Sequence, residues 1–336
     1  VVVTRDRQAS LLVPGGDYMR QQIAEVSWIE DVRMVSSPDP RAIAAVFDVS
    51  GGGTSQPDPL RSFGAEVYRI LDEAGAAGQP VAVAGIEAMP VTVFRDLQAA
   101  LPAGLHDGPD VVAQLRAVKS SEEVELMRQV ATLSDACYQR MLEVLEDGMM
   151  GYQLSAEMDH AARRSGADLA YNCVHSAPGG DLARGKLSIK PHDVELRAGD
   201  YISVNAYVVH QGYWIQADRT GTIGPELSGT AAEMFAANLE AQDEALTAVE
   251  PGLPIGELVH LADAAAARRG YRIQGGRIGH GQGLDYSEMP FLIAGSEEPL
   301  RPGNVFVLHV CLEMPGTSIL INPIADLCHV TADGVE

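Results

Sequence analysis

The sequence predicts two consecutive domains of mixed helix and strand, in the α/β (α+β) class. Its 336 residues are more than one typical domain needs. Apolar residues recur at helical spacing in several segments, and strand-like apolar runs lie between these segments. The pattern changes near residue 108, so we expect a smaller domain over residues 1–108 and a larger one over residues 109–336.

Segments of the first domain alternate between strand and helix patterns. The opening "VVVTRDRQASLLVPG" has two apolar runs around a polar turn, which predicts a hairpin. "PLRSFGAEVYRILDEAGAAG" has helical spacing and a glycine stop. "RAIAAVFDVSGGG" and "PVAVAGIEAMP" are typical of helix-to-loop and strand-to-turn segments. Because the chain opens in an apolar run without Met, we expect the natural start of this domain to be missing.

The second domain begins with a strong helix signal. Ser120 or Ser121 can cap a helix whose first turn carries Glu122 and Glu123, where the helix dipole favours acidic groups. Further helices are predicted in "LSAEMDHAARRSGA", "LSGTAAEMFAANLEAQDEALTAVEPG" and "IGELVHLADAAAARRGY". Strands are predicted in "DYISVNAYVVHQGYWIQADRTGTIG", "NVFVLHVCLEMPG" and "ILINPIADLCHVTADG".

The composition excludes several classes of partner. The net charge of −22 repels phosphate backbones and anionic lipid, so we expect neither nucleic acid nor membrane as a partner. The four cysteines form no C-x-x-C pair, which is typical of reduced thiols. No apolar run approaches the roughly 18 residues of a membrane span, and no signal peptide is visible. We therefore expect a cytoplasmic protein with a small-molecule substrate.

Several motifs occur together in a recognisable order. They are "LRAVKSSEEVELMRQVA", the hairpin "LRAGDYISVNAYVVHQGYWIQADRTGTIG", the turn "GHGQGLDYSEMP", and the closing "LRPGNVFVLHVCLEMPG" and "VTADG". Over residues 85–336 the chain resembles the creatinase, prolidase and methionine aminopeptidase family. The resemblance implies a pita-bread fold for the second domain, and a truncated form of the family's smaller domain before it. It also implies a homodimer, in which the small domain of one subunit covers the pocket of the other.

The metal ligands of that family are missing here. A family metallopeptidase binds two divalent metals through two Asp, one His and two Glu, because hard cations prefer carboxylate oxygen. The resemblance places these positions, in chain order, at residues that carry no carboxylate: Asn205, Gln216, His280, His309 and Ala325. We therefore expect no metal and no cofactor.

Creatinase is a member of that family that works without metal, and "GDYISVN" is similar to its strand. Creatinase's catalytic His position falls near Ser188, its hairpin carboxylate on Asp218, and its second His on Ser287. We expect a metal-independent, creatinase-like enzyme that acts on a small polar nitrogen-containing metabolite. The reaction is C–N hydrolysis, or a lyase, cyclisation or isomerisation step.

Strand periodicity gathers the candidate residues, because residues two apart share one face of a strand. Two imidazoles beside a carboxylate suit general acid/base catalysis, and Asp218 should raise the pKa of His309. The expected catalytic residues are His309, His280, Asp218 and His175. The expected substrate-binding residues are Asn205, Tyr207, Gln216, Ser287, Glu288, Ser188 and Cys311.

Other interpretations remain open. His280, His309 and Asp218 match a facial triad in ligand type, so one metal ion is an alternative. A binding protein that kept the fold and lost the chemistry is another. Asp218 beside Arg219 can form an ion pair within the hairpin, and His280 can simply hold its glycine-rich turn.

Overall fold

A computed structural model of the chain describes residues 1–14, 22–23, 25–36, 60–108, 111–185 and 193–336. It divides into two compact units, Val1–Val112 and Ala113–Glu336. The expected domain boundary after residue 108 lies close to this division. The segment "RAIAAVFDVSGGG" falls outside the described residues.

The first unit is a small α/β structure. Its elements are β1 (Val2–Val3), β2 (Ala9–Pro14), β3 (Asp31–Val35), α3 (Phe63–Glu73), β4 (Val81–Val83), α4 (Val91–Ala100) and β5 (Leu105–Asp107). β1 pairs antiparallel with β2, so the predicted hairpin is confirmed, and β3 adds in parallel to β2. β4 and β5 form a second, parallel pair. Helix α3, capped by the Ser62 side chain, confirms the predicted helix.

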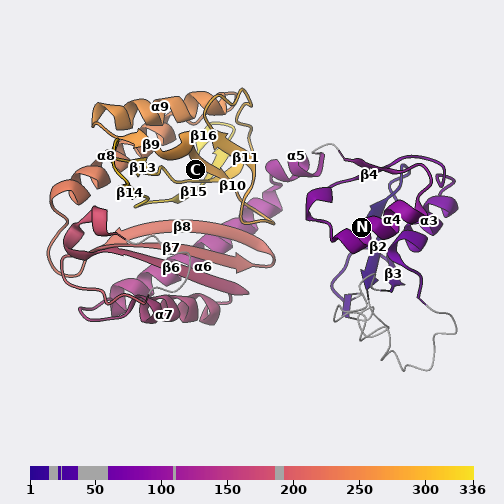
Figure 1. Ribbon diagram of the computed structural model, residues 1–336, viewed down its shortest axis with the longest axis horizontal. Coiled ribbons are helices and arrows are strands. Elements are labelled where there is room, and N and C mark those ends of the chain that lie inside the picture. The colour runs from indigo at the N-terminus through magenta and orange to yellow at the C-terminus, as the bar shows by residue number, and fades with distance from the viewer. Residues whose placement is uncertain (15–21, 24, 37–59, 109–110, 186–192) are drawn as a thin grey trace. The chain divides into compact units, whose positions relative to one another are not determined.

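The second unit stacks helices and sheets in layers (Figure 1). Its helices are α5 (Val111–Ala117, which begins at the division), α6 (Ser121–Val144), α7 (Gly151–Arg164), α8 (Gly229–Ala248) and α9 (Ile255–Arg268). Its longer strands are β6 (Leu169–Ala177), β7 (Tyr201–His210), β8 (Tyr213–Gly221), β10 (Arg277–Gly281), β11 (Glu288–Ile293), β12 (Val305–Leu308) and β15 (Asp326–Thr331). Its two-residue strands are β9 (Arg272–Ile273), β13 (Leu312–Glu313), β14 (Leu320–Ile321) and β16 (Gly334–Val335). Helices α6 and α7 cover one side, and α8 and α9 cover the other (Figure 1).

Helix α6 begins where the sequence predicted. The Ser120 hydroxyl accepts a hydrogen bond from the Glu123 backbone N–H at 3.2 Å, and the Glu123 carboxylate accepts one from the Ser120 N–H at 2.8 Å. This reciprocal pair is a capping box, which satisfies two backbone donors at the start of the helix. The cap therefore fixes the first residue of the long helix that supports the central sheet.

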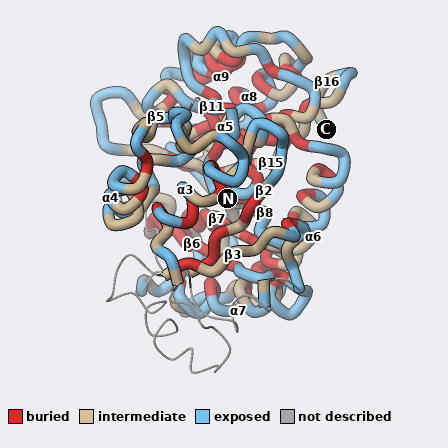
Figure 2. The backbone as a smooth tube through the Cα atoms, turned by 90° about the vertical axis from the view of Figure 1, so that its right-hand side faces the viewer, coloured by how far each residue is buried: buried red, intermediate tan, exposed pale blue. Residues whose placement is uncertain are grey.

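The sheet β6–β7–β8 has a helix-covered face and a pocket face. Along β7, buried Ile202, Val204, Ala206 and Val208 belong to the apolar core that includes α6 and α7 residues. The alternate residues Ser203, Asn205 and Tyr207 line a pocket. Strand β7 is buried over almost its whole length (Figure 2). Burial of each large aliphatic side chain stabilises the fold by about 1.5–3 kcal/mol. The apolar face therefore fixes the orientation of the strand, and with it the polar residues that line the pocket.

The second sheet has the order β11–β10–β12–β15–β16, and its middle depends on glycine. A Cβ at Gly279 would lie 2.0 Å from the Val307 carbonyl oxygen, and one at Gly281 would lie 2.1 Å from that of Met289. Only glycine therefore lets β10 approach both neighbours this closely. The glycines around His280 thus serve strand packing, and they place His280 at a buried position.

The two sheets meet at a short bridge. The Asp218 N–H donates to the Ala325 carbonyl oxygen at 3.2 Å, and the Ala325 N–H donates back at 3.1 Å. Residues from β8 and from the segment before β15 are therefore held side by side beneath the pocket face.

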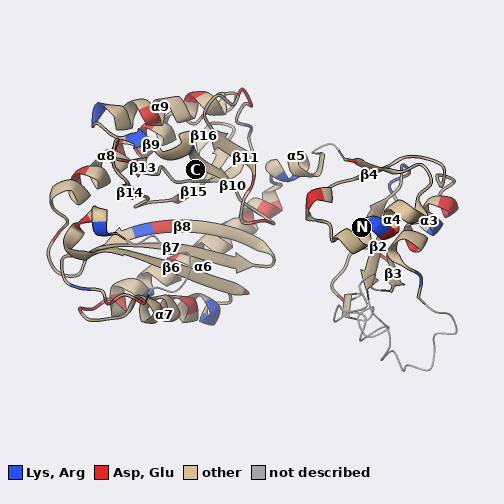
Figure 3. Ribbon diagram, viewed as in Figure 1, with Lys and Arg blue, Asp and Glu red and all other residues tan. Residues whose placement is uncertain are grey.

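Acidic residues are spread over helices α6 to α9, and arginines accompany them on α6, α7 and α9 (Figure 3). Among the described residues, no helix combines the length and the apolar character that crossing a bilayer requires.

Candidate functional site

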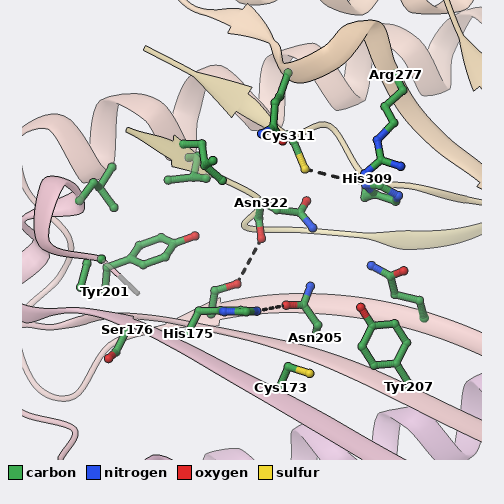
Figure 4. A pocket seen from close by; sticks show the side chains of 18 of the residues that line it. Cys173, His175, Ser176, Tyr201, Asn205, Tyr207, Arg277, His309, Cys311 and Asn322 are labelled. Atoms are coloured by element: carbon green, nitrogen blue, oxygen red, sulfur yellow. Dashed lines mark hydrogen bonds between the residues drawn. The ribbon is translucent and has the colours of Figure 1, made fainter. Parts of the chain in front are cut away.

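A pocket of about 350 Å³ lies on the polar face of the β6–β7–β8 sheet. Strands β6 and β7 supply one wall, which includes His175, Asn205 and Tyr207 (Figure 4). The opposite wall carries Arg277 and His309 (Figure 4). This volume lies at the small end of the range for ligand pockets, about 300–1,000 Å³, so the site suits a small ligand.

One wall is a chain of hydrogen bonds that ends on Asp218. The His175 ring nitrogen Nε2 bonds to the Asn205 Oδ1, and Asn205 in turn hydrogen-bonds the Asp218 carboxyl. Gln216 Nε2 donates to Asp218 Oδ2 at 3.1 Å, and Asn322 Nδ2 donates to the same oxygen at 2.5 Å. His175 lies in strand β6, whose residues pair with β7.

Asp218 lies beneath the pocket and does not line it. Its side chain was expected to share the pocket face with Gln216, yet it is fully buried under the amide groups that bond to it. Burial raises the pKa of Asp218 to about 7, although the three amide donors pull the pKa down. The alternative ion pair with Arg219 is not formed, because that guanidinium pairs with Asp326 at 2.7 Å.

His280 is a neutral imidazole with a defined tautomer. Burial lowers its pKa below the ordinary value. Its Nδ1 lies 3.1 Å from the Gly281 carbonyl oxygen, which only accepts hydrogen bonds, so Nδ1 carries the proton. Nε2 is therefore a bare nitrogen that can accept a proton from a bound water.

His309 differs from His280 in its hydrogen-bond role. Burial and the neighbouring His280 lower the pKa of His309 to about 3, so the expectation that Asp218 raises this pKa is wrong. The Cys311 thiol, whose pKa burial raises to about 12, lies 4.0 Å from His309 Nδ1 and can donate to it only as a weak S–H group. The other ring nitrogen of His309, Nε2, is buried and has no hydrogen-bond partner.

The structure brings most of the predicted site residues together. The residues from the prediction that line the pocket are His175, Asn205, Tyr207, Gln216, His280, His309 and Cys311. His280 and His309 meet edge to face, with ring centroids 5.3 Å apart. The roles that the sequence assigned to these residues remain predictions.

Two of the predicted substrate-binding residues, Ser287 and Glu288, do not join the pocket. Ser287 is exposed and is not among the lining residues. Glu288 instead forms a buried ion pair with Lys119 at 2.6 Å and a second one with Arg116. A carboxylate held by two cations has no free oxygen to offer a ligand, which is why it turns away from the site. Ser188 lies outside the described residues.

Sequence reasoning missed several polar pocket residues, among them Arg277 and Asn322. Arg277 lies at the start of β10, three residues before His280, and Asn322 lies in the loop after β14. The first could have been found from the strand pattern around His280. The second comes from a loop, whose path no periodicity indicates.

Comparison with known proteins identifies the family. Residues 125–332 match the model of metallopeptidase family M24. The probable dipeptidase PepE of Mycobacterium tuberculosis is 30% identical over 79% of this chain and 69% of its own length. An uncharacterized peptidase of Staphylococcus aureus is 26% identical over 75% of this chain and 71% of its own length. The chain belongs to metallopeptidase family M24.

Solved structures agree on the fold. A Xaa-Pro dipeptidase from Bacillus anthracis has a TM-score of 0.78 at 21% identity, over 98% of this chain and 83% of that one. The dipeptidase PepE from Mycobacterium ulcerans has a TM-score of 0.72 at 25% identity, over 98% and 82%. The predicted α/β class and pita-bread architecture, with a smaller domain in front, are therefore confirmed.

These relatives correct the expected function. A metal-independent, creatinase-like enzyme for a nitrogen-containing metabolite is contradicted, because the matched relatives are named peptidases and dipeptidases. The similarity of the rest of the chain to these relatives outweighs the five altered positions. The family is one of enzymes, and peptide chemistry is what its named members share.

The residues present do not fit the family's metal pair. The five ligand positions supply two neutral amides, two imidazoles of lowered pKa and a methyl group. Two dications in a buried pocket need anionic oxygen ligands, and the one nearby carboxyl, Asp218, is enclosed by amide donors. Among the described residues, no group of three or more His, Cys, Asp and Glu side chains is arranged to hold a metal ion.

Proposed function

We propose that this chain acts on short peptides, by hydrolysis of a peptide bond in a ligand about two residues long. The observation that carries the proposal is the pocket of about 350 Å³ on the central sheet, with two imidazoles and several amide groups in its lining. Its size suits a dipeptide, since it lies near the lower limit of ligand pockets, about 300 Å³. The names of the dipeptidase relatives support the same substrate class.

The pocket offers hydrogen-bond partners that a peptide can use. Gln216 Oε1 and Asn322 Oδ1 are buried acceptors without a partner, and both residues line the pocket. The N–H groups of a peptide bond and of an amino terminus are donors of the matching kind. A buried acceptor left unpaired costs about 1–3 kcal/mol, so a ligand that supplies such donors gains from these two groups.

The chemistry uses His280 as the proton acceptor. Water gives a proton to its bare Nε2, and the water oxygen bonds to the carbonyl carbon of the peptide. The C–N bond then breaks, and the proton passes from His280 to the leaving amine. The products are a carboxylic acid and an amine.

Hydrolysis is tested by mass spectrometry of dipeptide mixtures incubated with the purified chain. Separate incubations contain EDTA, Mn²⁺ or Zn²⁺. We expect release of free amino acids in at least one of these incubations, and its loss in His280→Ala. The exposed His260 provides the matched control, since His260→Ala should leave the rate unchanged. No release from any dipeptide under any of the three conditions overturns the proposal.

A further inference from the structure

Arg277 is a cation in the pocket without an anionic partner. The chain has 46 acidic and only 24 basic residues, so an arginine readily finds a carboxylate. Many described arginines do so; Arg219 and Arg269, for example, are paired. Arg277 has no ion pair and no hydrogen bond to any other described side chain, although it lines the pocket.

The pocket around Arg277 is neutral. Its described lining residues include no Asp and no Glu, and Arg277 is the one permanent charge among them. The guanidinium lies close enough to lower the pKa of both His280 and His309. Nothing on this wall neutralises the charge, so the wall favours a ligand that brings an anion.

His309 provides a second, independent observation. Its side chain is only 6% exposed, yet the buried Nε2 has no hydrogen-bond partner. Arg277 and His309 lie next to each other on the same wall, with the guanidinium directed toward the imidazole (Figure 4). The planar fork of guanidinium N–H groups is an arrangement that binds the two oxygens of a carboxylate, and the unpartnered imidazole nitrogen lies beside it.

We propose that Arg277 and His309 hold the free carboxylate of the ligand, so that Arg277 is a specificity-determining residue of this pocket. The substrate class rests on the proposed function: a short peptide whose carboxylate terminus is not blocked. Gln216 and Asn322 face its N–H groups, while the carboxylate lies at the wall formed by β10 and the end of β12. Peptides with an amidated terminus lose the charged contact.

Titration calorimetry with alanyl-alanine and with its C-terminal amide tests this proposal. We expect the wild-type chain to bind the free acid about tenfold more tightly than the amide. This is the lower end of the contribution of a charged hydrogen bond, because Arg277 is exposed to solvent. Arg277→Gln should remove that preference and leave amide binding unchanged. Arg272→Gln makes the same change at an exposed arginine that does not line the pocket, and it should keep the preference.

The outcomes separate this inference from the proposed function. Equal binding of acid and amide by the wild-type chain overturns the role of Arg277 and leaves peptide recognition standing. An equal loss of preference in Arg277→Gln and Arg272→Gln also overturns it, because the effect is then one of net charge. Failure of both ligands to bind overturns the proposed function itself.

Discussion

The buried Asp218 carboxyl should make the stability of the chain depend on pH. Its folded pKa is about 7, against an ordinary value of 3.8. Between these values the folded state keeps a proton that the unfolded state has released, so the free energy of unfolding falls as pH rises. The contribution is complete below the unfolded pKa and is lost once pH passes the folded pKa. Within this window, each rise of one pH unit lowers the free energy of unfolding by about 1.4 kcal/mol.

Urea unfolding of wild type and Asp218→Asn at about pH 5.5 and about pH 8 isolates this contribution. Both pH values lie above the isoelectric point of about 4.7, so the chain stays negatively charged. Wild-type chain should lose roughly 2 kcal/mol more than Asp218→Asn between the two conditions. The exposed Asp135 gives the control, and Asp135→Asn should follow the wild type. An identical pH dependence in wild type and Asp218→Asn would refute the raised pKa.

Four other predictions concern separate parts of the molecule. Glu288→Gln should lower the free energy of unfolding by roughly 3 kcal/mol in urea titrations, because it strands the buried Lys119 cation, whereas the exposed Glu297→Gln should change little. His280→Ala should lower the rate of dipeptide hydrolysis roughly 100-fold with a similar KM, whereas His309→Ala should mainly raise KM; the reverse pattern contradicts the two assigned roles. Calorimetric titration with Mn²⁺ should show no stoichiometric binding, and two ions per chain would contradict the fit of the five positions. Light scattering at micromolar concentration should give the mass of a homodimer, as the resemblance implies, and a monomer mass would count against it.

Much of the fold could be predicted because local signals agree with tertiary packing. The capping residues Ser120 and Glu123 define the start of α6 in sequence and structure alike. The hairpin of β7 and β8 follows from alternating apolar and polar residues, which also predicted that Asn205 and Tyr207 share the pocket face. Helix α4 has no side-chain cap at its start, and the sequence analysis did not predict it.

The site was harder to predict because strand periodicity indicates which face of the sheet a residue lies on, but not how deeply its side chain is buried. Gln216 and Asp218 do point to the same side, but the amides of Gln216 and Asn322 close over the carboxyl and exclude it from the pocket. Glu288 follows the turn at the right distance, yet Lys119 and Arg116, about 170 residues earlier in the chain, draw it away. Such long-range contacts leave no pattern in the local sequence.

The central claim, that the pocket takes a short peptide by its carboxylate, is tested most directly by a crystal structure of the His280→Ala variant with alanyl-alanine. The account predicts the dipeptide in the pocket, with its carboxylate against Arg277 and His309 and its N–H groups toward Gln216 and Asn322. A dipeptide bound with its carboxylate away from Arg277, or a pocket that stays without ligand at saturating dipeptide, would contradict it.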